Sequence, residues 1–505
     1  MLDRVMSPHA LAPQDLADRL LADLAGGAAG TISDSTETVS FDGIRRAALR
    51  ITGHLEPLGT GAVAVCAQKH PATIAAVLGV LAAGRAYAPL DPTHPKGRWI
   101  DILAGLRPSA VIVDASTREK LQGWAAETGT PLLDLGEAED LEAGVNGCAM
   151  PAGCAAVLHT SGSTGVPKQV RIGADAIGTF CEWVAAEFGV CSGDVLLSHS
   201  PLAFDLSFLD IFVGLSRGAS LVLADSAAAR SGARLSAMIA DHGVTVLHAT
   251  PSALGMIVDA AGGRVFPSVR CVLFAGEPMS AARLAGIARA FPNARLTNIY
   301  GCTETNDTFF YDVPRDHVPD PLPLGRPLPY TDHLVMTPDA RRVEPGEEGE
   351  LWVRCPTMMI GYADPELTRR VSGQFEGKTY YRTGDRVRMD ADGLVYILGR
   401  IDSVRKVNGY RVDLAEIEAC LMRHPGVRET AVFLGENDQL AAVVSSDDPE
   451  VKSLGLRMHA MQTLPAYAIP KSFCLTSDPL PKNSNGKICR KTIAASPNSA
   501  AASTA

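Results

Sequence analysis

A short stretch of hydroxyl and glycine residues followed by a lysine has the composition of a phosphate-binding turn. The segment LHTSGSTGVPKQV covers residues 158–170 and follows an apolar run. Small side chains let backbone N–H groups and hydroxyls approach phosphate oxygens closely. The spacing differs from the GxxxxGK[ST] pattern of a P-loop, and such a turn taken alone is more often a linker than a phosphate site. The residues that it would offer to phosphate are Thr160, Ser161, Gly162, Ser163, Thr164, Gly165 and Lys168.

Five further segments follow this turn, and the six together form one ordered pattern. They are FDLSFLDIF, NIYGCTET, YRTGDR, LGRIDSVRKVNGYRVDLAEIE and LPKNSNGKICRK. In this order they resemble the AMP-forming adenylating superfamily, which includes acyl-CoA synthetases, luciferases and the adenylation domains of nonribosomal peptide synthetases. The resemblance runs from about GRAYAPLDPTHP to Lys487, and FDLS is similar to the amino-acid-activating branch. It implies that ATP adenylates a carboxylate and that pyrophosphate leaves.

The resemblance implies roles in ATP binding for residues that would otherwise be interpreted as turn and surface residues. It places Tyr300 against adenine, Thr303 near the α-phosphate and Glu304 on Mg²⁺. It assigns the ribose hydroxyls to Asp385, with Arg400 at the ribose or phosphate. A divalent ion and a cation suit this reaction, because attack at the α-phosphorus concentrates negative charge. Further ATP contacts that it implies are Gly276, Asn298 and Gly301.

Lys487 in NSNGKI matches the catalytic lysine of the superfamily, although a single lysine in such a loop is normally a solvent-facing charge. The resemblance implies that it bridges the carboxylate and α-phosphate oxygens during adenylate formation and is then withdrawn as a small domain rotates. A point charge suits a transition state that gathers negative charge. Asp402 matches the pivot of that rotation.

The second half of the implied reaction needs a thiol from outside the chain. No nucleophilic side chain is required, since the work is positioning and charge neutralisation. No GGxS-like carrier motif follows Lys487, so we expect a stand-alone enzyme that loads a separate phosphopantetheinylated carrier protein or free CoA. The resemblance favours the carrier protein, in nonribosomal peptide, antibiotic or other secondary-metabolite biosynthesis.

The amino-acid pocket also follows from the resemblance, which assigns the α-amino group of the substrate to Asp205. A buried carboxylate facing an ammonium is physically reasonable, because an unpaired buried charge is costly. For Asp205 alone, a helix N-cap would be an equally good interpretation. The pocket resembles those of prolyl and D-alanyl carrier-protein ligases, which activate small amino acids. Its residues are Asp205, Leu206, Leu209, His248, Leu273, Ala275, Ile299, Asp307, Thr308 and Lys487.

His248 and Asp307 are polar where a pocket for plain proline would be apolar. An unpaired polar group in a buried pocket costs roughly 1–3 kcal/mol, so each must find a partner. Either the two side chains satisfy each other, or they face a hydroxyl or amine of the substrate. The second alternative favours serine, threonine, a polar cyclic imino acid or a diamino acid over proline.

Two positions depart from the pattern of the superfamily. Gln169 stands where Gly usually follows the lysine of the phosphate turn, and Cys302 stands where Pro is usual in NIYGCTET. Neither change removes a charge that the reaction uses. We therefore expect the chain to be active.

Hydrophobic patterning predicts the elements that must position these residues. From about residue 33 to 285, helical patterns alternate with apolar runs such as AVAVCA, SAVIVD, SLVLAD, TVLHAT and CVLFAG, which predicts parallel α/β sheets. The apolar stretch 72–84 is too short for a bilayer span and predicts a buried helix. After residue 400 the pattern changes to the helical DLAEIEACLMR and the strands ETAVFL and QLAAVV.

The predicted fold class is therefore α/β, with a large N-terminal domain of stacked α/β subdomains and a small α+β C-terminal domain joined by a hinge. We expect the large domain to cover residues 1–399 and the small mobile domain, which carries the catalytic lysine, to cover 400–495. The last ten residues, 496–505, are small and polar without periodicity, and we expect a disordered tail.

Composition excludes some classes of partner. The net charge of −10 argues against general binding to nucleic acid or anionic membranes, which needs clustered Lys and Arg. No signal peptide or membrane span is recognisable, and eleven cysteines without a CxxC pair favour free thiols in a reducing compartment. We therefore expect a cytoplasmic enzyme.

Two other functions remain open from the sequence. An acyl- or aryl-CoA ligase would share the nucleotide motifs but would not need Asp205. A non-catalytic relative would be expected to have lost at least one charged residue of the reaction, whereas Lys168, Glu304, Asp385, Arg400 and Lys487 are all present.

Overall fold

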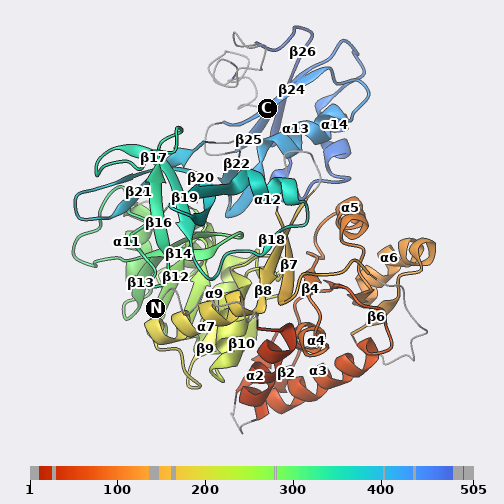
Figure 1. Cartoon of the computed structure of the whole chain (residues 1–505), viewed down its shortest axis with the longest axis vertical. Helices are drawn as coiled ribbons and strands as arrows, with labels where there is room; N and C mark the ends of the chain where they lie inside the picture. The colour runs from red at the N-terminus through yellow and green to blue at the C-terminus, as the bar shows by residue number, and fades with distance from the viewer. Residues whose placement is uncertain are drawn as a thin grey trace. The chain divides into compact units, whose positions relative to one another are not determined.

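A computed structural model describes most of the chain and divides its contacts between two compact units. Unit 1 comprises residues 1–92, 106–159 and 169–401, and unit 2 comprises 93–105, 160–168 and 402–505. Figure 1 shows the course of the chain through both units. The described residues are 11–25, 30–135, 147–160, 167–277, 279, 281–401, 404–435, 439–481 and 493.

The largest sheet has nine strands within the described residues and is mainly parallel. Its central strands are short and nearly wholly buried, because helices cover both faces, as the continuous apolar runs predict. In sheet order its strands are β15 (Arg326–Pro327), β14 (Asn306–Asp312), β13 (Arg295–Cys302), β12 (Cys271–Phe274), β11 (Val246–Ala249), β9 (Val195–Ser198), β10 (Ser220–Leu223), β1 (Thr31–Ser33) and β2 (Thr38–Ser40).

A second sheet, with seven strands in the described part of the chain, has the same buried parallel centre. Its strand β3 pairs in parallel with both β4 and β5, as expected for β-α-β crossovers. In sheet order its strands are β18 (Gly361–Tyr362), β8 (Lys168–Gly173), β7 (Cys154–Thr160), β4 (Tyr87–Pro89), β3 (Val63–Cys66), β5 (Ala110–Val113) and β6 (Leu132–Asp134).

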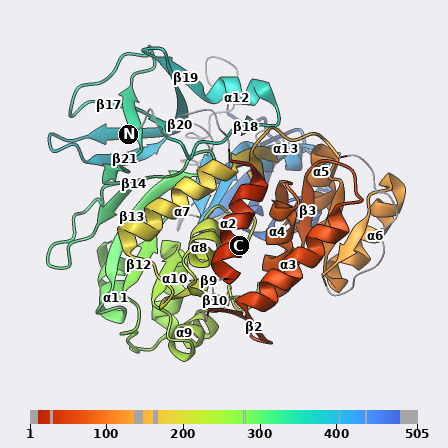
Figure 2. The ribbon, with the colours of Figure 1, turned by 60° about the horizontal axis from the view of Figure 1, so that its bottom comes forward.

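Helices of unit 1 pack between and around these sheets. Helix α2 packs against α4, α7 and α8, and their arrangement can be followed in Figure 2. The remaining helices contribute to the same layers or to the sheet edges. Their bounds are α2 (Pro13–Ala25), α3 (Phe41–Leu55), α4 (Pro71–Ala82), α6 (Ala115–Thr128), α7 (Ala174–Phe188), the π-helix η1 (Leu209–Val213), α8 (Gly214–Ser216), α9 (Gly232–Asp241), α10 (Pro251–Ala260), α11 (Ala281–Ala290) and α12 (Pro365–Val371).

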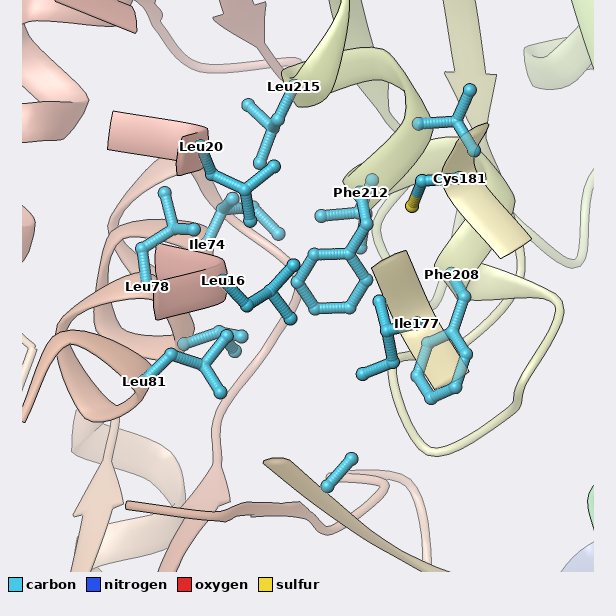
Figure 3. Close-up of a cluster of buried hydrophobic side chains, with 14 of the residues drawn as sticks. Leu16, Leu20, Ile74, Leu78, Leu81, Ile177, Cys181, Phe208, Phe212 and Leu215 are labelled. Carbon is cyan, nitrogen blue, oxygen red and sulfur yellow. The ribbon is translucent and has the colours of Figure 1, made fainter. Parts of the chain in front are cut away.

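Helix α4 is the buried helix expected over residues 72–84. The His70 side chain caps its N-terminus by accepting from the Ala72 amide, and Pro71 occupies the first turn. Its apolar residues surround the axis because the helix is covered on every side. Figure 3 shows Ile74 and Leu78 of α4 in one cluster with Leu16 of α2 and Phe212 of η1.

A third sheet, antiparallel, carries the segment YRTGDR. Its strands are β16 (Asp332–Met336), β17 (Glu348–Arg354), β20 (Lys378–Met389) and β19 (Ser372–Phe375), with β21 (Val395–Arg400) paired to β20. Asp385 and Arg400 are register partners on β20 and β21. Two residues far apart in sequence are thereby placed opposite each other.

Unit 2 has a smaller core built on two short sheets. The hairpin of β22 and β23 leads into α13, which Asp413 caps by accepting from the Ala415 amide. Arg98 of α5 forms a buried ion pair with Glu416 of α13 at 2.7 Å. The elements are α5 (Lys96–Leu106), β22 (Val404–Val407), β23 (Tyr410–Asp413), α13 (Leu414–Met422), β24 (Glu429–Leu434), β25 (Leu440–Ser445), α14 (Ser453–Ala460), the 3₁₀-helix η3 (Ala466–Ala468) and β26 (Ser472–Thr476).

The predicted fold class is confirmed: a large α/β unit with stacked sheets accompanies a smaller α+β unit. Within the described residues, no helix combines the length and the hydropathy needed to cross a bilayer. Ten of the eleven cysteines lie in the described ranges, and all ten are free thiols, as predicted. The proposed pivot Asp402 and the tail 496–505 lie outside the described residues.

Candidate active site

Three of the residues predicted to bind ATP form one buried cluster in unit 1. The Tyr300 hydroxyl donates a hydrogen bond to Oδ2 of Asp385, and Nη1 of Arg400 donates to Oδ1 at 2.9 Å. Arg400 also donates to the Thr383 carbonyl at 2.8 Å. Burial and then the Asp385 charge raise the pKa of Tyr300 well above its ordinary value, so the phenol stays protonated and donates. The cluster presents a fixed carboxylate beside an aromatic ring.

The turn between β13 and β14 carries Thr303 and Glu304. Asn306 has a φ of 55° at the start of β14, and a Cβ on Gly301 would lie 2.1 Å from the Asn306 carbonyl, so only glycine fits there. A bulge between Tyr300 and Gly301 re-aims the strand at this point. The turn is thus specified by local backbone constraints next to the Tyr300 cluster.

Cys302 replaces the usual proline, and contacts with Thr305 support the turn in its place. Its Sγ lies 3.2 Å from the Thr305 hydroxyl, and the Thr305 amide donates to the Cys302 carbonyl at 2.9 Å. Gln169 is buried, and its carbonyl accepts from the Ala363 amide. Both unusual residues are therefore accommodated by regular packing.

Glu304 is fully buried, and its Oε1 accepts a hydrogen bond from the Tyr362 hydroxyl at 2.5 Å. No group of three or more metal-ligating side chains occurs in the described ranges. The Glu304 carboxylate fits Mg²⁺, which usually binds through one or two carboxylates and completes its shell with water and substrate phosphates. A single oriented carboxylate therefore suits a magnesium ion that arrives with ATP.

Four predicted pocket residues, His248, Leu273, Ala275 and Ile299, share one face of the nine-stranded sheet. His248 and Leu273 are register partners on β11 and β12, and Ala275 lies two residues beyond Leu273. Leu273 pairs with Thr297 on β13, which puts Ile299 on the same face, and Gly301 pairs with Asp307 beyond the bulge, where the alternation of side chains is interrupted. Because side chains alternate along a strand, Asn298 and Tyr300 point to the opposite face. The sheet thus separates the predicted amino-acid contacts from these two predicted nucleotide contacts.

Packing supports this separation. Leu273, Ala275 and Ile299 belong to the hydrophobic cluster that also holds Leu209 of η1, whereas Tyr300 belongs to a cluster on the third sheet. Thr308 is fully buried and donates to the Tyr300 carbonyl at 3.2 Å, so one predicted pocket residue touches the nucleotide side. Asn298 uses its side-chain amide to donate to the Pro323 carbonyl at 2.8 Å.

Asp205 lies on the turn that precedes η1, and Leu206 follows it. Both are half-buried, and Oδ1 of Asp205 accepts from the Leu206 amide at 3.0 Å. The Phe208 amide donates to the Asp205 carbonyl at 2.9 Å, which continues the turn into the π-helix. Single-turn π segments are frequent at functional sites.

His248 is 2% exposed, and neither ring nitrogen makes a regular hydrogen bond. Burial lowers its pKa to about 4, with the nearby Leu206 backbone opposing the shift, so the ring is neutral at neutral pH. His248 and Asp307 do not pair, so the alternative in which they satisfy each other is wrong. Asp307 is 8% exposed, and its charge helps to raise the pKa of Tyr330, after burial and Cys355.

Sequence patterns did not reveal a buried polar group formed by Lys69, Ser198 and Asp210. Lys69 and Asp210 are 7% and 1% exposed, and Ser198 lies between them. The signal was present, because Asp210 interrupts the apolar run FLDIFVGL that is otherwise buried. A carboxylate in such a run requires a buried partner.

The predicted phosphate turn is only partly described, and the predicted catalytic lysine lies outside the described residues. Thr160 ends β7, buried and with no hydrogen bond to its hydroxyl, and Lys168 begins β8. Gly276 follows β12 with a φ of 93°. Ser161, Gly162, Ser163, Thr164, Gly165 and Lys487 lie outside the described residues, so their predicted roles stay predictions.

Comparisons with known proteins find similarity over nearly the whole chain. Residues 25–363 match the family model described as AMP-binding enzyme, and residues 416–487 match the model of the AMP-binding enzyme C-terminal domain. An L-proline--[L-prolyl-carrier protein] ligase of Pseudomonas fluorescens is 33% identical over 487 residues, covering 92% of this chain and 95% of that protein. Phenyloxazoline synthase MbtB of Mycobacterium sp. is 34% identical over 92% of this chain, which spans only 40% of that protein.

The fold also occurs in solved structures. The Vibrio cholerae adenylation domain AlmE, in complex with glycyl-adenosine-5'-phosphate, superposes with a TM-score of 0.81 at 20% identity, covering 95% of this chain and 97% of that one. At that identity the likeness shows a shared architecture, which agrees with the stacked sheets and the smaller second unit.

Proposed function

The chain belongs to the family of AMP-binding enzymes and is an AMP-forming ligase, and we propose that it adenylates a small amino acid and transfers the aminoacyl group to a carrier-protein thiol. The observation that carries this proposal is the near full-length match to a ligase that acts on L-proline and a carrier protein. Asp205 supports it, since a half-buried carboxylate beside the pocket face can bind an ammonium.

The substrate that we propose is a small amino acid with a hydroxyl or a second amine. His248 offers two ring nitrogens without regular partners, and a buried polar atom left unpaired costs roughly 1–3 kcal/mol. A substrate hydroxyl or amine would satisfy one of them. The Asp307 carboxylate would likewise favour a hydrogen-bond donor on the substrate. An analogue without that group would then bind less well, as in sites built to hydrogen-bond their substrates.

The nucleotide side acts by positioning and charge. Asp385, fixed by Tyr300 and Arg400, would accept the ribose hydroxyls, and the Tyr300 ring would lie against adenine. Glu304 would hold Mg²⁺, which neutralises charge on the phosphates when bound. Thr303 would bind the α-phosphate, and Lys487 would stabilise the charge that develops as a carboxylate oxygen attacks the α-phosphorus.

Amino-acid-dependent ATP–pyrophosphate exchange tests the proposal without a carrier. The panel contains proline, hydroxylated and diamino cyclic acids, serine, threonine, linear diamino acids and simple carboxylates. One strong response to a polar small amino acid is the expected result. Exchange with simple carboxylates alone would move the enzyme to the acyl-CoA ligase branch, and exchange with none of the panel would refute adenylation of these acids.

A loading assay tests the thiol acceptor. Purified enzyme, ATP and the best amino acid are incubated with a phosphopantetheinylated carrier protein or with free CoA. Mass spectrometry should detect the aminoacyl mass on the carrier arm, formed faster than aminoacyl-CoA. A preference for CoA would contradict the carrier-protein part of the proposal and leave adenylation intact.

A further inference from the structure

A buried lysine connects the two parallel sheets of unit 1. Lys69 follows β3 of the seven-stranded sheet, two residues before α4, and its side chain extends to the end of β9 in the nine-stranded sheet. Nζ donates to the Ser198 carbonyl at 2.9 Å, to the Ser198 hydroxyl at 3.2 Å and to the Ser200 carbonyl at 2.5 Å. All three protons of the ammonium are thereby used.

Ser198 links this lysine to a buried carboxyl group. Asp210 on η1 is 1% exposed, so burial raises the pKa of its carboxyl group, while the positive charge of Lys69 and a hydrogen bond from the Ser198 hydroxyl oppose that rise. Burial lowers the pKa of Lys69, and the negative charges of Asp210 and Asp91 oppose that shift. The chain of contacts therefore runs from the ammonium through a hydroxyl to a carboxylate, all of them buried.

These contacts fix both ends of one segment. Lys69 holds Ser198 and Ser200 at its start, and Asp210 belongs to η1 at its end. Between them the backbone makes consecutive turns, from the Phe204 amide to the Pro201 carbonyl at 3.0 Å and from the Ser207 amide to the Phe204 carbonyl at 3.1 Å. The segment 198–210 presents Asp205, Leu206 and Leu209.

The opposite side of the segment is held by apolar packing. The rings of Phe208 and Phe212 meet edge to face with centroids 5.7 Å apart. Figure 3 shows Phe212 beside Leu16 of α2, with Ile177 of α7 next to Phe208. These contacts cover the apolar side of the segment, whereas the Lys69 ammonium bonds the Ser198 and Ser200 carbonyls on its polar side. The segment is therefore held from both sides, and the Lys69 ammonium is its polar anchor.

We propose that Lys69 is a positioning residue that sets the place of Asp205, the carboxylate expected to bind the substrate ammonium, by fixing the β9 end and, through Ser198, η1. This inference rests on the proposed function. Stability alone gives no reason for a buried ammonium here, because replacing a buried ion pair with apolar residues is often neutral or stabilising. Lys69 would therefore affect the geometry of the amino-acid side only.

Lys69→Met tests the proposal against Lys120→Met, an exposed lysine on α6. In pyrophosphate exchange, the KM for the amino acid should rise at least about tenfold, which corresponds to one lost charged hydrogen bond, while the KM for ATP changes less than about threefold. Lys120→Met should match the wild type. Equal rises in both KM values, or no rise in either, would overturn the positioning role.

A second readout does not depend on the proposed function. Amide hydrogen exchange of the apoprotein should be faster over residues 199–208 in Lys69→Met, with β13 as protected as in the wild type. Wild type without amino-acid-dependent pyrophosphate exchange would defeat the proposed function, whereas unchanged amide exchange over 199–208 would defeat this inference.

A double variant separates positioning from stability. Lys69→Met with Asp210→Leu removes both charges, so the resistance to urea should recover relative to Lys69→Met. The amino-acid KM should stay raised, because the Ser198 and Ser200 carbonyls still lack the ammonium. Recovery of both the resistance to urea and the amino-acid KM would show that Lys69 and Asp210 have a structural role only. If Lys69→Met does not fold, Ser198→Ala decides the question, with a smaller rise of the amino-acid KM expected and an unchanged KM overturning the proposal.

Discussion

The proposed nucleotide side and the proposed amino-acid side of unit 1 satisfy their polar groups in different ways. On the nucleotide side, Asp385 is bonded on both oxygens, and Glu304 accepts from Tyr362. On the amino-acid side, both ring nitrogens of His248 and Oδ2 of Asp210 have no regular hydrogen bond. The Asp385 and Glu304 carboxylates are thus held before a ligand arrives, whereas His248 and Asp210 leave polar atoms for a ligand or for polarisation by neighbours.

This difference separates groups that would act in the same way on every substrate from groups that would discriminate between amino acids. Hydrogen-bonded groups are held in one geometry, which suits a nucleotide that never changes. Unpaired buried atoms cost free energy until a matching group arrives, which suits discrimination between substrates. Variants on the nucleotide side should therefore affect every amino acid equally, and variants on the other side should change the ranking of amino acids.

The largest effect is expected for Lys487→Ala. Removing one preorganised charge at the developing transition state typically costs about 10²–10³ in rate, so adenylate formation should fall by that factor with every amino acid. Transfer from a supplied aminoacyl adenylate to the carrier should be nearly unchanged. Lys482→Ala, in the same segment, is the matched control. Equal loss of both half-reactions would refute the division of labour assigned to this lysine.

Asp385→Asn should have the next largest effect and should act on ATP alone. The amide keeps the volume but loses the charge that Arg400 faces, and a hydrogen bond to a charged group contributes about 1.5–3 kcal/mol. The KM for ATP should rise about 10- to 100-fold, equally for all amino acids. Asp392→Asn, exposed at the turn between β20 and β21, should behave as wild type. A change in amino-acid ranking would break the separation of the two sides.

The buried imidazole of His248 leads to a prediction of how stability depends on pH. An unfolded chain protonates His248 near pH 6.5, but the folded protein does so only near pH 4. Stability should therefore fall as pH drops from 7.5 to 5, by about 2 kcal/mol for this residue at pH 5, since each pKa unit corresponds to about 1.4 kcal/mol.

Urea unfolding at the two pH values measures this effect. His248→Gln cannot titrate, so its loss of stability should be smaller than that of the wild type by that amount. His242→Gln, exposed at the end of α9, should lose as much as the wild type. An identical loss in all three proteins would show that the folded His248 accepts a proton as easily as the unfolded chain.

Local patterns were sufficient to predict most of the large unit. Apolar runs such as VAVC and CVLF became buried parallel strands, and the apolar stretch after His70 became α4, because each pattern has one favourable environment. The packing of α5 against α13 of the same unit through Arg98 and Glu416 could not be predicted, since no local pattern encodes a contact between residues 318 positions apart.

The candidate site shows the same limit. Motif resemblance selected Tyr300, Asp385 and Arg400, which the fold brings together, because a motif records residues whose geometry is the same in every relative. It did not select Lys69, because a lysine before a helix is normally a surface charge and its burial depends on the packing of two sheets. The failure of His248 and Asp307 to pair likewise depends on strand placement.

The smallest effect, a change of preference, is expected for Asp307→Ala. Asp307 lies opposite Gly301 on β14, and a carboxylate in the proposed pocket would favour substrates that carry a hydroxyl or a second amine. Losing that hydrogen bond, at about 1.4 kcal/mol, should reduce the kcat/KM ratio of the polar amino acid to proline about tenfold, with the KM for ATP unchanged. Asp312→Ala, on the same strand but paired at the surface with Arg295, is the control. If the ratio stays constant while both substrates weaken together, Asp307 supports the strand and does not select the side chain, and the polar pocket would then depend on His248 alone.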